Sequence, residues 1–420
     1  MPSIGDRVAV IGGGVTGVTT AYKLAKAGYR VSLFDKHPYP AMETSFANGG
    51  QLSASNAEVW NSWSTIGKGL RWMLTPGAPL LVNPYPSWHK LSWMAEFIAA
   101  IPTYERSTEA TARLAIAARG VLQAMAAEEN IAFDCETRGI LHVYQTRAEF
   151  EHAARVTEIL RRAGLGRREV SPAEIRDIEP ALKGDFYGGF FTESDFTGDI
   201  HKFTNGLAAS CWRLGVENRL GCEIEWIYAD KGDIRIRFRH LADTEEFEPL
   251  EQASFDKVVV CAGVCSRRLA RELGDRINVY PVKGYSITVQ LTERIDQEAA
   301  PWVSLLDDDA KIVTSRLGVD RFRVAGTAEF NGFNRDIRSA RIEPLVAWCR
   351  SHFPDMSTRQ YMSWSGLRPM MPDMMPRVIA GRRPGVFYNT GHGHLGWTLS
   401  AVTAEMVTSL ISRTDAAQNA

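Results

Sequence analysis

The chain has 420 residues, 45% of them hydrophobic and 23% charged, a balance typical of globular proteins and a length that allows two domains. Its net charge of −1 leaves no basic excess for holding a nucleic-acid backbone, so we expect no nucleic-acid partner. The six cysteines form no C-x-x-C pair and match no zinc or iron–sulfur spacing, so we expect no metal site and a reducing compartment. Without a signal peptide or a membrane-spanning apolar run, the expected location is the cytoplasm.

The chain is predicted to begin with a compact β-α-β unit. Residues 8–11 are a short β-branched run that predicts a buried strand, and residues 15–27 carry apolar side chains at helical spacing. Gly28 follows as a helix-ending residue, and residues 30–35 predict the second strand.

Residues 60–104 differ from the rest of the chain in composition. They hold five of the eleven tryptophans, together with several prolines, which favours loops and short helices. The tryptophans are Trp60, Trp63, Trp72, Trp88 and Trp93. Three interpretations remain open: protein core, the entrance to a substrate site, or a patch that touches a membrane surface. The first two are favoured together over the third.

The remaining elements alternate between helices and strands. A capping box at residues 171–174, with proline at the first helical position, begins one helix. Other helices are predicted at 105–129, 149–162, 201–214, 341–351 and from 396 to about 412, with only the last few residues disordered. Strands are predicted at 139–145, 186–191, 257–261, 361–365 and 386–389, with an antiparallel block at 279–290, 311–315 and 321–325 and a hairpin of 223–228 and 233–239 turning at 230–232. This order predicts two domains, each built from non-contiguous pieces.

The strongest local motif is the glycine turn after the first strand, which fits G-x-G-x-x-G with Gly12, Gly14 and Gly17. The first glycine allows a tight turn, the second a close approach of a pyrophosphate, and the third close packing of helix on strand. The helix that follows directs free N–H groups and a favourable dipole at the phosphates. Asp35 ends the second strand, where a carboxylate accepts hydrogen bonds from ribose hydroxyls and disfavours the 2′-phosphate of NADP. The motif therefore predicts a dinucleotide site.

The chain after Asp35 favours FAD over NAD. In an NAD-binding domain the rest of the sheet follows directly, whereas this chain continues into Thr44-Ser-Phe-Ala-Asn-Gly-Gly-Gln-Leu52. Two further glycine turns lie far downstream, at residues 258–263 and 389–397. Contact with several remote segments suits the longer cofactor.

Three side chains near the C-terminal end are candidates for chemistry. Arg368 stands beside a proline at the end of a predicted strand, where its planar group could clamp a substrate carboxylate with two hydrogen bonds. The alternative for Arg368 is a structural salt bridge, which arginines form more often. His392 and His394 lie in the glycine-rich turn before the last helix. Each is a candidate neighbour of a cofactor ring, and the alternative is that it forms hydrogen bonds with local backbone groups.

Together these segments resemble the D-amino acid dehydrogenase family of the bacterial small-subunit type, within the glycine oxidase/D-amino acid oxidase superfamily. The resemblance covers nearly the whole chain and is carried by residues 8–17, 43–52, 197–203, 280–286, 332–334, 366–373 and 389–397. It implies an α/β fold with a Rossmann-like FAD-binding domain of the glutathione-reductase type and an α+β substrate domain with a large mixed sheet. The implied FAD-binding domain comprises residues 1–87, 190–276 and 358–415, and the substrate domain residues 88–189 and 277–357.

The implied reaction is oxidative deamination of a D-amino acid to the 2-oxo acid and ammonia by hydride transfer to flavin N5. Electrons would pass to a respiratory, quinone-type acceptor, which allows for peripheral contact with the inner membrane. The superfamily's flavin-linking cysteine has no counterpart here, so non-covalent FAD is expected. Arg368 matches the carboxylate-binding arginine, with Tyr285 as its expected helper, and Gln51 and His394 are further substrate residues. The expected cofactor residues are Gly12, Gly14, Val15, Thr16, Gly17, Asp35, Lys36, Ser45, Phe46, Ala47, Asn48, Gly50, Gln51, Leu52, Ile224, Cys261, Ala262, Gly263, Gly391, His392, Gly393, His394, Leu395, Gly396, Trp397 and Thr398.

The sequence departs from the family pattern at two places. Met374 and Met375 stand where the family usually has a small residue and glycine, and His394 stands where a small hydroxyl residue is commoner. Three alternatives therefore remain: a glycine-, sarcosine-, hydroxyproline- or opine-type oxidoreductase, an NAD-dependent dehydrogenase, and a non-catalytic flavin-binding subunit.

Overall fold

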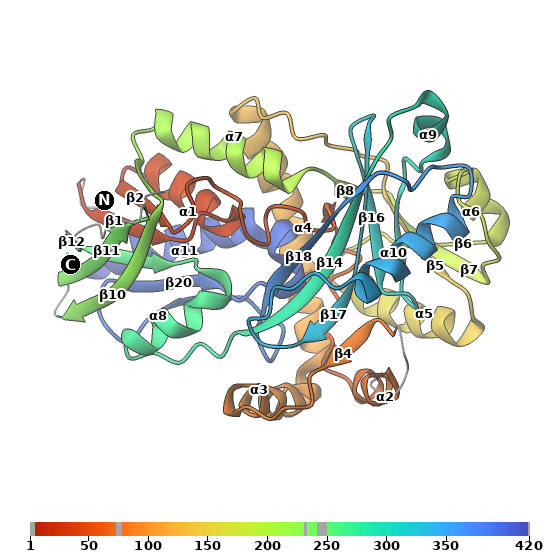
Figure 1. The fold of residues 1–420 in the computed structure, drawn as a ribbon. Helices are drawn as coiled ribbons and strands as arrows, with labels where there is room; N and C mark the ends of the chain where they lie inside the picture. Colours follow the sequence, from red (N-terminus) through yellow and green to blue (C-terminus); the bar gives the residue numbers. More distant parts are fainter. Residues whose placement is uncertain (1–4, 73–77, 231–232, 242–249, 419–420) are drawn as a thin grey trace.

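The computed structural model describes residues 5–72, 78–230, 233–241 and 250–418, which build two halves around two large sheets (Figure 1). The predicted β-α-β start is confirmed as β1 (Arg7–Ile11), α1 (Val15–Lys26) and β2 (Arg30–Asp35). Val8, Ala9 and Val10 are completely buried because β1 lies between two parallel neighbours. Gly28, at a φ of 92°, ends the helical turn as expected.

The first half is a six-stranded sheet covered on both faces. Its order is β19-β20-β13-β1-β2-β9, parallel except at the edge pair β19–β20. Helices α1, α7 and α11 bury one face, and a three-stranded sheet with α8 buries the other. The further elements of this half are α7 (Ile200–Arg213), β9 (Glu217–Leu220), β10 (Cys222–Asp230), β11 (Asp233–His240), β12 (Glu251–Phe255), β13 (Lys257–Val260), α8 (Ser266–Glu272), β19 (Arg377–Ala380), β20 (Val386–Thr390) and α11 (Gly396–Gln418).

The second half is a nine-stranded mixed sheet of order β18-β14-β17-β16-β15-β5-β7-β6, with β4 paired to β17. Helix α10 packs over it through Ile342, Leu345 and Val346. Its elements are β4 (Leu80–Val82), β5 (Ile140–Tyr144), α5 (Arg147–Arg162), β6 (Arg168–Val170), α6 (Pro172–Ile178), β7 (Gly188–Thr192), β14 (Tyr280–Gln290), α9 (Arg294–Ala299), β15 (Ser304–Asp307), β16 (Ile312–Leu317), β17 (Arg321–Phe330), α10 (Ser339–His352) and β18 (Tyr361–Met370). The predicted combination of a Rossmann-like domain and a large mixed sheet is therefore confirmed.

Three helices and a small ribbon join the halves. Helix α4 (Tyr104–Glu128) runs between them, and α2 (Trp63–Trp72) and α3 (Trp88–Ala99) lie together at the edge where β4 joins the large sheet (Figure 1). The ribbon pairs β3 (Gln51–Leu52) with β8 (Phe196–Thr197). Within the described ranges, no helix combines the length and apolar character needed to cross a membrane.

The structure departs from the predicted elements in two respects. Helix α11 continues to Gln418, so the expected end near residue 412 is wrong. Asp415 explains the extension, because its carboxylate accepts a hydrogen bond from Tyr29 at 2.7 Å and pairs with Lys257 at 3.0 Å. Strands β4 and β18 belong to the large sheet, although the predicted domain segments placed them with the cofactor domain. The hairpin partners β10 and β11 pair as predicted, but their turn at 231–232 lies outside the described residues.

Candidate active site

A cavity of about 1070 Å³ reaches from the glycine turn after β1 to the inner sides of α2 and α3. This volume lies at the upper end of the range for ligand sites, as a long cofactor together with a substrate requires. Its wall comes from the β1–α1 turn, residues 42–53, the turn after β13, strands β14, β17 and β18, and residues 389–398. Segments remote in sequence therefore meet at one site, as the glycine turns predicted.

The glycine turn has the geometry that a phosphate loop requires. Gly12 adopts a φ of 117°, and a Cβ there would lie 2.5 Å from the Cys261 carbonyl oxygen. A Cβ on Gly17 would lie 1.7 Å from the Gly12 carbonyl oxygen, so only glycine allows α1 to pack this closely. A Cβ on Gly14 would meet only the Ser45 hydroxyl, at 3.4 Å. Gly14 therefore leaves the backbone open on the cavity side, where a diphosphate fits.

Two side chains fix the start of helix α1. The Val15 N–H donates to the Ser45 hydroxyl at 3.0 Å. Asp35 accepts from the N–H of Gly13 at 2.6 Å and of His37 at 2.8 Å. Burial raises the pKa of the Asp35 carboxyl, and the two backbone donors oppose this rise. Each carboxylate oxygen retains a second lone pair, so the predicted ribose contact stays open.

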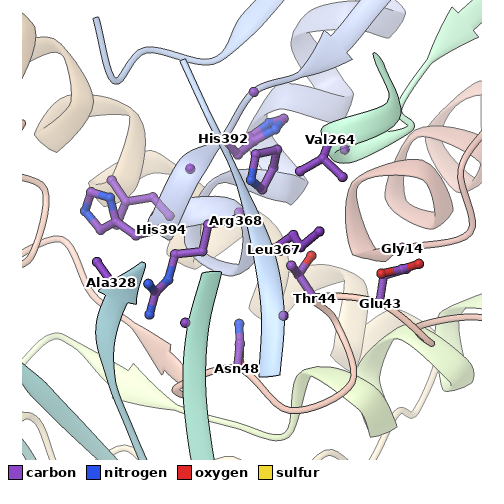
Figure 2. Close-up of a pocket in the computed structure, with 18 of the residues that line it drawn as sticks. Gly14, Glu43, Thr44, Asn48, Val264, Ala328, Leu367, Arg368, His392 and His394 are labelled. Carbon is purple, nitrogen blue, oxygen red and sulfur yellow. The ribbon is translucent and has the colours of Figure 1, made fainter. Parts of the chain in front are cut away.

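An ionic cluster that the sequence did not reveal closes the cofactor end of the cavity. Glu43 lies near the Gly14 turn (Figure 2). Its Oε1 atom lies 3.3 Å from Lys36 Nζ, 2.9 Å from His37 Nε2 and 3.0 Å from Arg335 Nη2. Burial opposes ionisation of Glu43, but hydrogen bonds from His37 and Arg335 outweigh it and hold the pKa at about 2. Because Arg335 is 292 positions away, no local sequence signal could have linked it to Glu43.

The structure brings most of the predicted cofactor residues to the cavity wall, with three exceptions. Gly17 packs against the Gly12 carbonyl instead, and Leu52 is completely buried in the core. Phe46 points away from the cavity and packs on His201, with ring centroids 5.0 Å apart. Phe46 lies in a turn, in which its N–H donates to the Glu43 carbonyl at 2.9 Å, while its neighbours Ser45 and Ala47 line the cavity.

Arg368 lines the centre of the cavity without a carboxylate partner among the described residues, so a structural salt bridge does not explain it. Its Nη1 donates to the Thr327 carbonyl at 2.9 Å. Burial lowers the pKa of Arg368 to about 10, which still leaves it charged at neutral pH. A half-buried cation that faces a cavity and has no acidic partner in the described part of the chain is suited to bind an anion from outside.

Two backbone features hold this arginine in place. A Cβ on Gly284 would lie 2.4 Å from the Arg368 Cζ, so the guanidinium packs flat over a position that must be glycine. Thr327 presents its carbonyl from a φ of 60°, a conformation that is costly for a β-branched residue. No sequence signal marked Thr327, since the residues of β17 and of its neighbours β14 and β16 were predicted only as ordinary strands.

We expect Gly284→Ala to displace the guanidinium while leaving the cofactor end intact. A misplacement of about 1 Å lowers catalytic efficiency on the order of 100-fold, and here it should raise KM more than it lowers kcat. Steady-state kinetics beside flavin content check this. The matched change Gly120→Ala, in an exposed part of α4 with open space around it, serves as the control. Unchanged KM in Gly284→Ala would show that the guanidinium position does not matter.

The expected role of the Tyr285 hydroxyl is not supported by the structure. Tyr285 borders the cavity, but its hydroxyl donates to Glu329 at 2.7 Å, and burial together with this bond raises its pKa. Strand β14 pairs with β18 so that Val282 stands opposite Arg368 and Tyr285 stands opposite Ser365. These two pairs are three positions apart along each strand, an odd number. Alternate residues of a strand face opposite sides, so the hydroxyl lies behind the sheet that carries Arg368.

The two histidines of the last turn have different environments. His392 is buried and its Nε2 lies 2.9 Å from the Thr403 hydroxyl, which favours the local structural role. His394 stacks on Trp60 at 4.9 Å, and its Nε2 lies 3.2 Å from the Asn56 carbonyl. A carbonyl only accepts, so Nε2 carries the proton and Nδ1 is left as an acceptor without a partner in the described residues. His394 therefore offers a lone pair beside Arg368.

We expect no catalytic titration of His394 at working pH. Burial, and to a lesser degree the charge of Arg368, lowers its pKa from 6.5 to about 4. A lowered pKa means that the neutral ring predominates at every pH above about 4, so kcat/KM should show no inflection near 6.5. A pH profile of turnover checks this. An inflection there that disappears in His394→Asn would show that the ring titrates.

Gln51 and the tryptophans complete the wall. The Gln51 side-chain amide donates to Ser304 at 2.8 Å and to the Leu305 carbonyl at 3.0 Å, while its Oε1 has no partner in the described residues. Its substrate role stays a prediction. Trp60, Trp72 and Trp93 line the cavity, and Trp93 also belongs to a buried apolar cluster, whereas Trp63 and Trp88 are exposed. A substrate entrance at these tryptophans stays a prediction.

The chain is similar to known FAD enzymes along its whole length. Residues 7–410 match the family described as DAO, FAD dependent oxidoreductase. The chain is 56% identical to D-amino acid dehydrogenase 3 of Mesorhizobium japonicum, over 97% of either protein. It is 42% identical to D-amino acid dehydrogenase of Paramagnetospirillum magneticum, over 97% of this chain and 95% of that protein. The fold matches glycine oxidase from Geobacillus kaustophilus with a TM-score of 0.75 at 21% identity, covering 97% of this chain and 95% of that one.

Proposed function

The chain belongs to the DAO family of FAD-dependent oxidoreductases, and from this premise we propose that it oxidises a D-amino acid to the 2-oxo acid and ammonia. The observation that carries the proposal is Arg368, a half-buried cation in the wall of the cavity with no carboxylate partner among the described residues. An arginine fork binds a carboxylate with two parallel hydrogen bonds, which is the group that every amino acid offers.

FAD supplies the acceptor for the hydride that leaves the substrate α-carbon. The chain supplies the holding and orientation of the substrate. Thr327 occupies Nη1 of Arg368, which directs the rest of the guanidinium toward the substrate carboxylate. Neutral His394 adds no positive charge to the substrate space. A substrate bound with its amine deprotonated by solvent would lose the α-hydrogen as hydride to the bound FAD and become an iminium ion, which water hydrolyses to the 2-oxo acid and ammonia.

Anaerobic reduction of the bound flavin tests the proposed reaction. A panel of D- and L-amino acids, with glycine and sarcosine included, should bleach the flavin with D-amino acids and leave it oxidised with their L-enantiomers. Bleaching by glycine or sarcosine alone would assign a different amine substrate. Failure of every amine to reduce the flavin would favour a non-catalytic role.

We propose that the electrons pass to a quinone-type respiratory acceptor rather than mainly to oxygen. The two relatives at 56% and 42% identity are named dehydrogenases, which supports an acceptor other than oxygen. Reoxidation of the substrate-reduced enzyme should be at least about tenfold faster with a soluble quinone analogue than with air-saturated buffer. Equal or faster reoxidation by oxygen would identify an oxidase instead.

We also propose a cytoplasmic protein that contacts the membrane surface through α2, α3 and the loop before α3. Trp63, Tyr85, Trp88, Leu91 and Ile98 are exposed there, with Tyr85 and Trp88 each 80% accessible. Large exposed apolar groups of this kind mark interaction sites. Its six cysteines are free thiols, which suits a reducing compartment.

We expect the double variant Trp63→Ser, Trp88→Ser to lose binding to phospholipid vesicles. Exposed tryptophans favour the membrane interface, and neither residue lines the cavity. Co-sedimentation with vesicles of mixed zwitterionic and anionic lipid measures the loss. Trp226→Ser, which removes another exposed tryptophan on β10, is the control. Equal sedimentation of all three proteins would dismiss the membrane contact.

A further inference from the structure

The end of the cavity beyond Arg368 has an apolar wall. Its side chains come from the loop before α2, from α3 and from the end of β17, and they belong to one apolar cluster. Trp93 packs on Phe97 and Phe330, with ring centroids 5.3 and 5.4 Å apart. The lining residues of this cluster are Trp60, Trp93, Met94, Phe97, Ala328 and Phe330.

This wall and the cofactor end lie on different sides of Arg368. In Figure 2, Ala328 and His394 lie on one side of the arginine, and Gly14 and Glu43 lie on the other. The phosphate turn belongs to the Gly14 side, so the space beside Ala328 is left for the substrate. A substrate whose carboxylate is fixed on Arg368 therefore meets the aromatic wall with its side chain.

Two of the charged side chains that border this space, Lys90 and Glu58, are already paired, and Lys68 of α2, which also lines the cavity, interacts electrostatically with Asp308. Lys90 donates to the backbone carbonyls of Asn83 and Tyr85. Glu58 accepts from the Tyr104 hydroxyl at 2.6 Å and lies 3.4 Å from His152. A charged substrate side chain entering here would give up its hydration without gaining an unpaired opposite charge at the wall.

We infer that the enzyme selects D-amino acids with a bulky apolar side chain, aromatic or long aliphatic, which packs against Trp60, Ala328 and Phe330. The inference rests on the proposed function and specifies its substrate class. A large apolar side chain covers the wall and removes it from water, whereas the methyl group of D-alanine leaves most of it uncovered. Aspartate-like and lysine-like side chains are excluded by the loss of hydration.

Kinetics of the wild-type protein with a redox dye provide the first test. We expect kcat/KM for D-phenylalanine or D-methionine to exceed that for D-alanine by at least about tenfold, as apolar pockets discriminate by size. D-aspartate and D-lysine should fall at least about 100-fold below the apolar pair, because burying an unpaired charge is costly. Activity that is greatest with D-alanine, D-aspartate or D-lysine would overturn the inference and leave the proposed function standing. Inactivity with all D-amino acids would remove the proposed function itself.

A variant that fills the space provides the second test. Ala328→Phe should lower the ratio of kcat/KM for D-phenylalanine to that for D-alanine by at least about tenfold, since overpacking excludes the larger side chain. Ala95→Phe makes the same change at an exposed position of α3 outside the cavity and should leave the ratio as in the wild type. An unchanged ratio in Ala328→Phe would contradict the inference. The wild-type series decides the question even if Ala328→Phe does not fold.

Discussion

Arg368→Ala should keep its flavin and lose catalytic efficiency with D-amino acids by roughly 30- to 4000-fold. Truncating one partner of a buried, hydrogen-bonded charge pair costs about 2–5 kcal/mol, and each 1.4 kcal/mol is tenfold. The loss should appear mainly in KM, because the guanidinium holds the substrate carboxylate and takes no part in the bond changes. Kinetics beside flavin absorbance measure both effects.

The same variant should fold well, which makes its kinetics interpretable. Arg368 has no carboxylate partner among the described residues, and its removal leaves only the Thr327 carbonyl without a donor. Arg368→Lys should recover part of the binding, since it retains the charge without the planar fork. Arg237→Ala, at an exposed site on β11, controls for loss of a positive charge. An Arg368→Ala enzyme with wild-type KM would remove the arginine from the substrate site.

Local patterns predicted the cofactor half because its chemistry is carried by contiguous residues. The glycine spacing needs a strand before it and a helix after it, and β1, α1 and β2 provide these in order. The clash distances at Gly12 and Gly17 explain why glycine stands there. Arg368 could be singled out because it stands beside a proline and matches a family motif.

The parts of the site that sequence could not predict depend on long-range pairing. Glu43 and Arg335 meet only because the loop after β2 approaches the loop between β17 and α10. The Tyr285 hydroxyl could not be placed from sequence because its face relative to Arg368 depends on the pairing of β14 with β18, in which Val282 and not Tyr285 stands opposite Arg368. The left-handed backbone at Thr327 likewise accompanies the β-bulge at which Thr327 and Ala328 of β17 stand opposite Gly284 of β14.

Gly14→Val should give a folded but colourless protein. Gly14 has a φ of −76°, which any residue adopts, and the space around its Cβ contains only the Ser45 hydroxyl within 4 Å. An added Cβ therefore meets no backbone atom of the protein, and a valine side chain there would occupy the side on which the backbone must approach a diphosphate. We expect flavin content to fall at least about tenfold, because the close approach of backbone to phosphate is lost. Circular dichroism should remain like that of the wild type.

Comparison with substitutions at Gly17 and Gly120 makes Gly14→Val a specific test of where the FAD diphosphate binds. Gly17→Val would place its Cβ 1.7 Å from the Gly12 carbonyl oxygen, so that variant should fail to fold and would say nothing specific about FAD. Gly120→Val makes the same substitution at an exposed position of α4 with open space around it and should remain fully yellow. Gly14→Ala should show an intermediate loss, since its side chain is smaller. A Gly14→Val protein that binds a full complement of flavin would mean that the diphosphate lies elsewhere, and the placement of substrate beside Ala328 would then lose its basis.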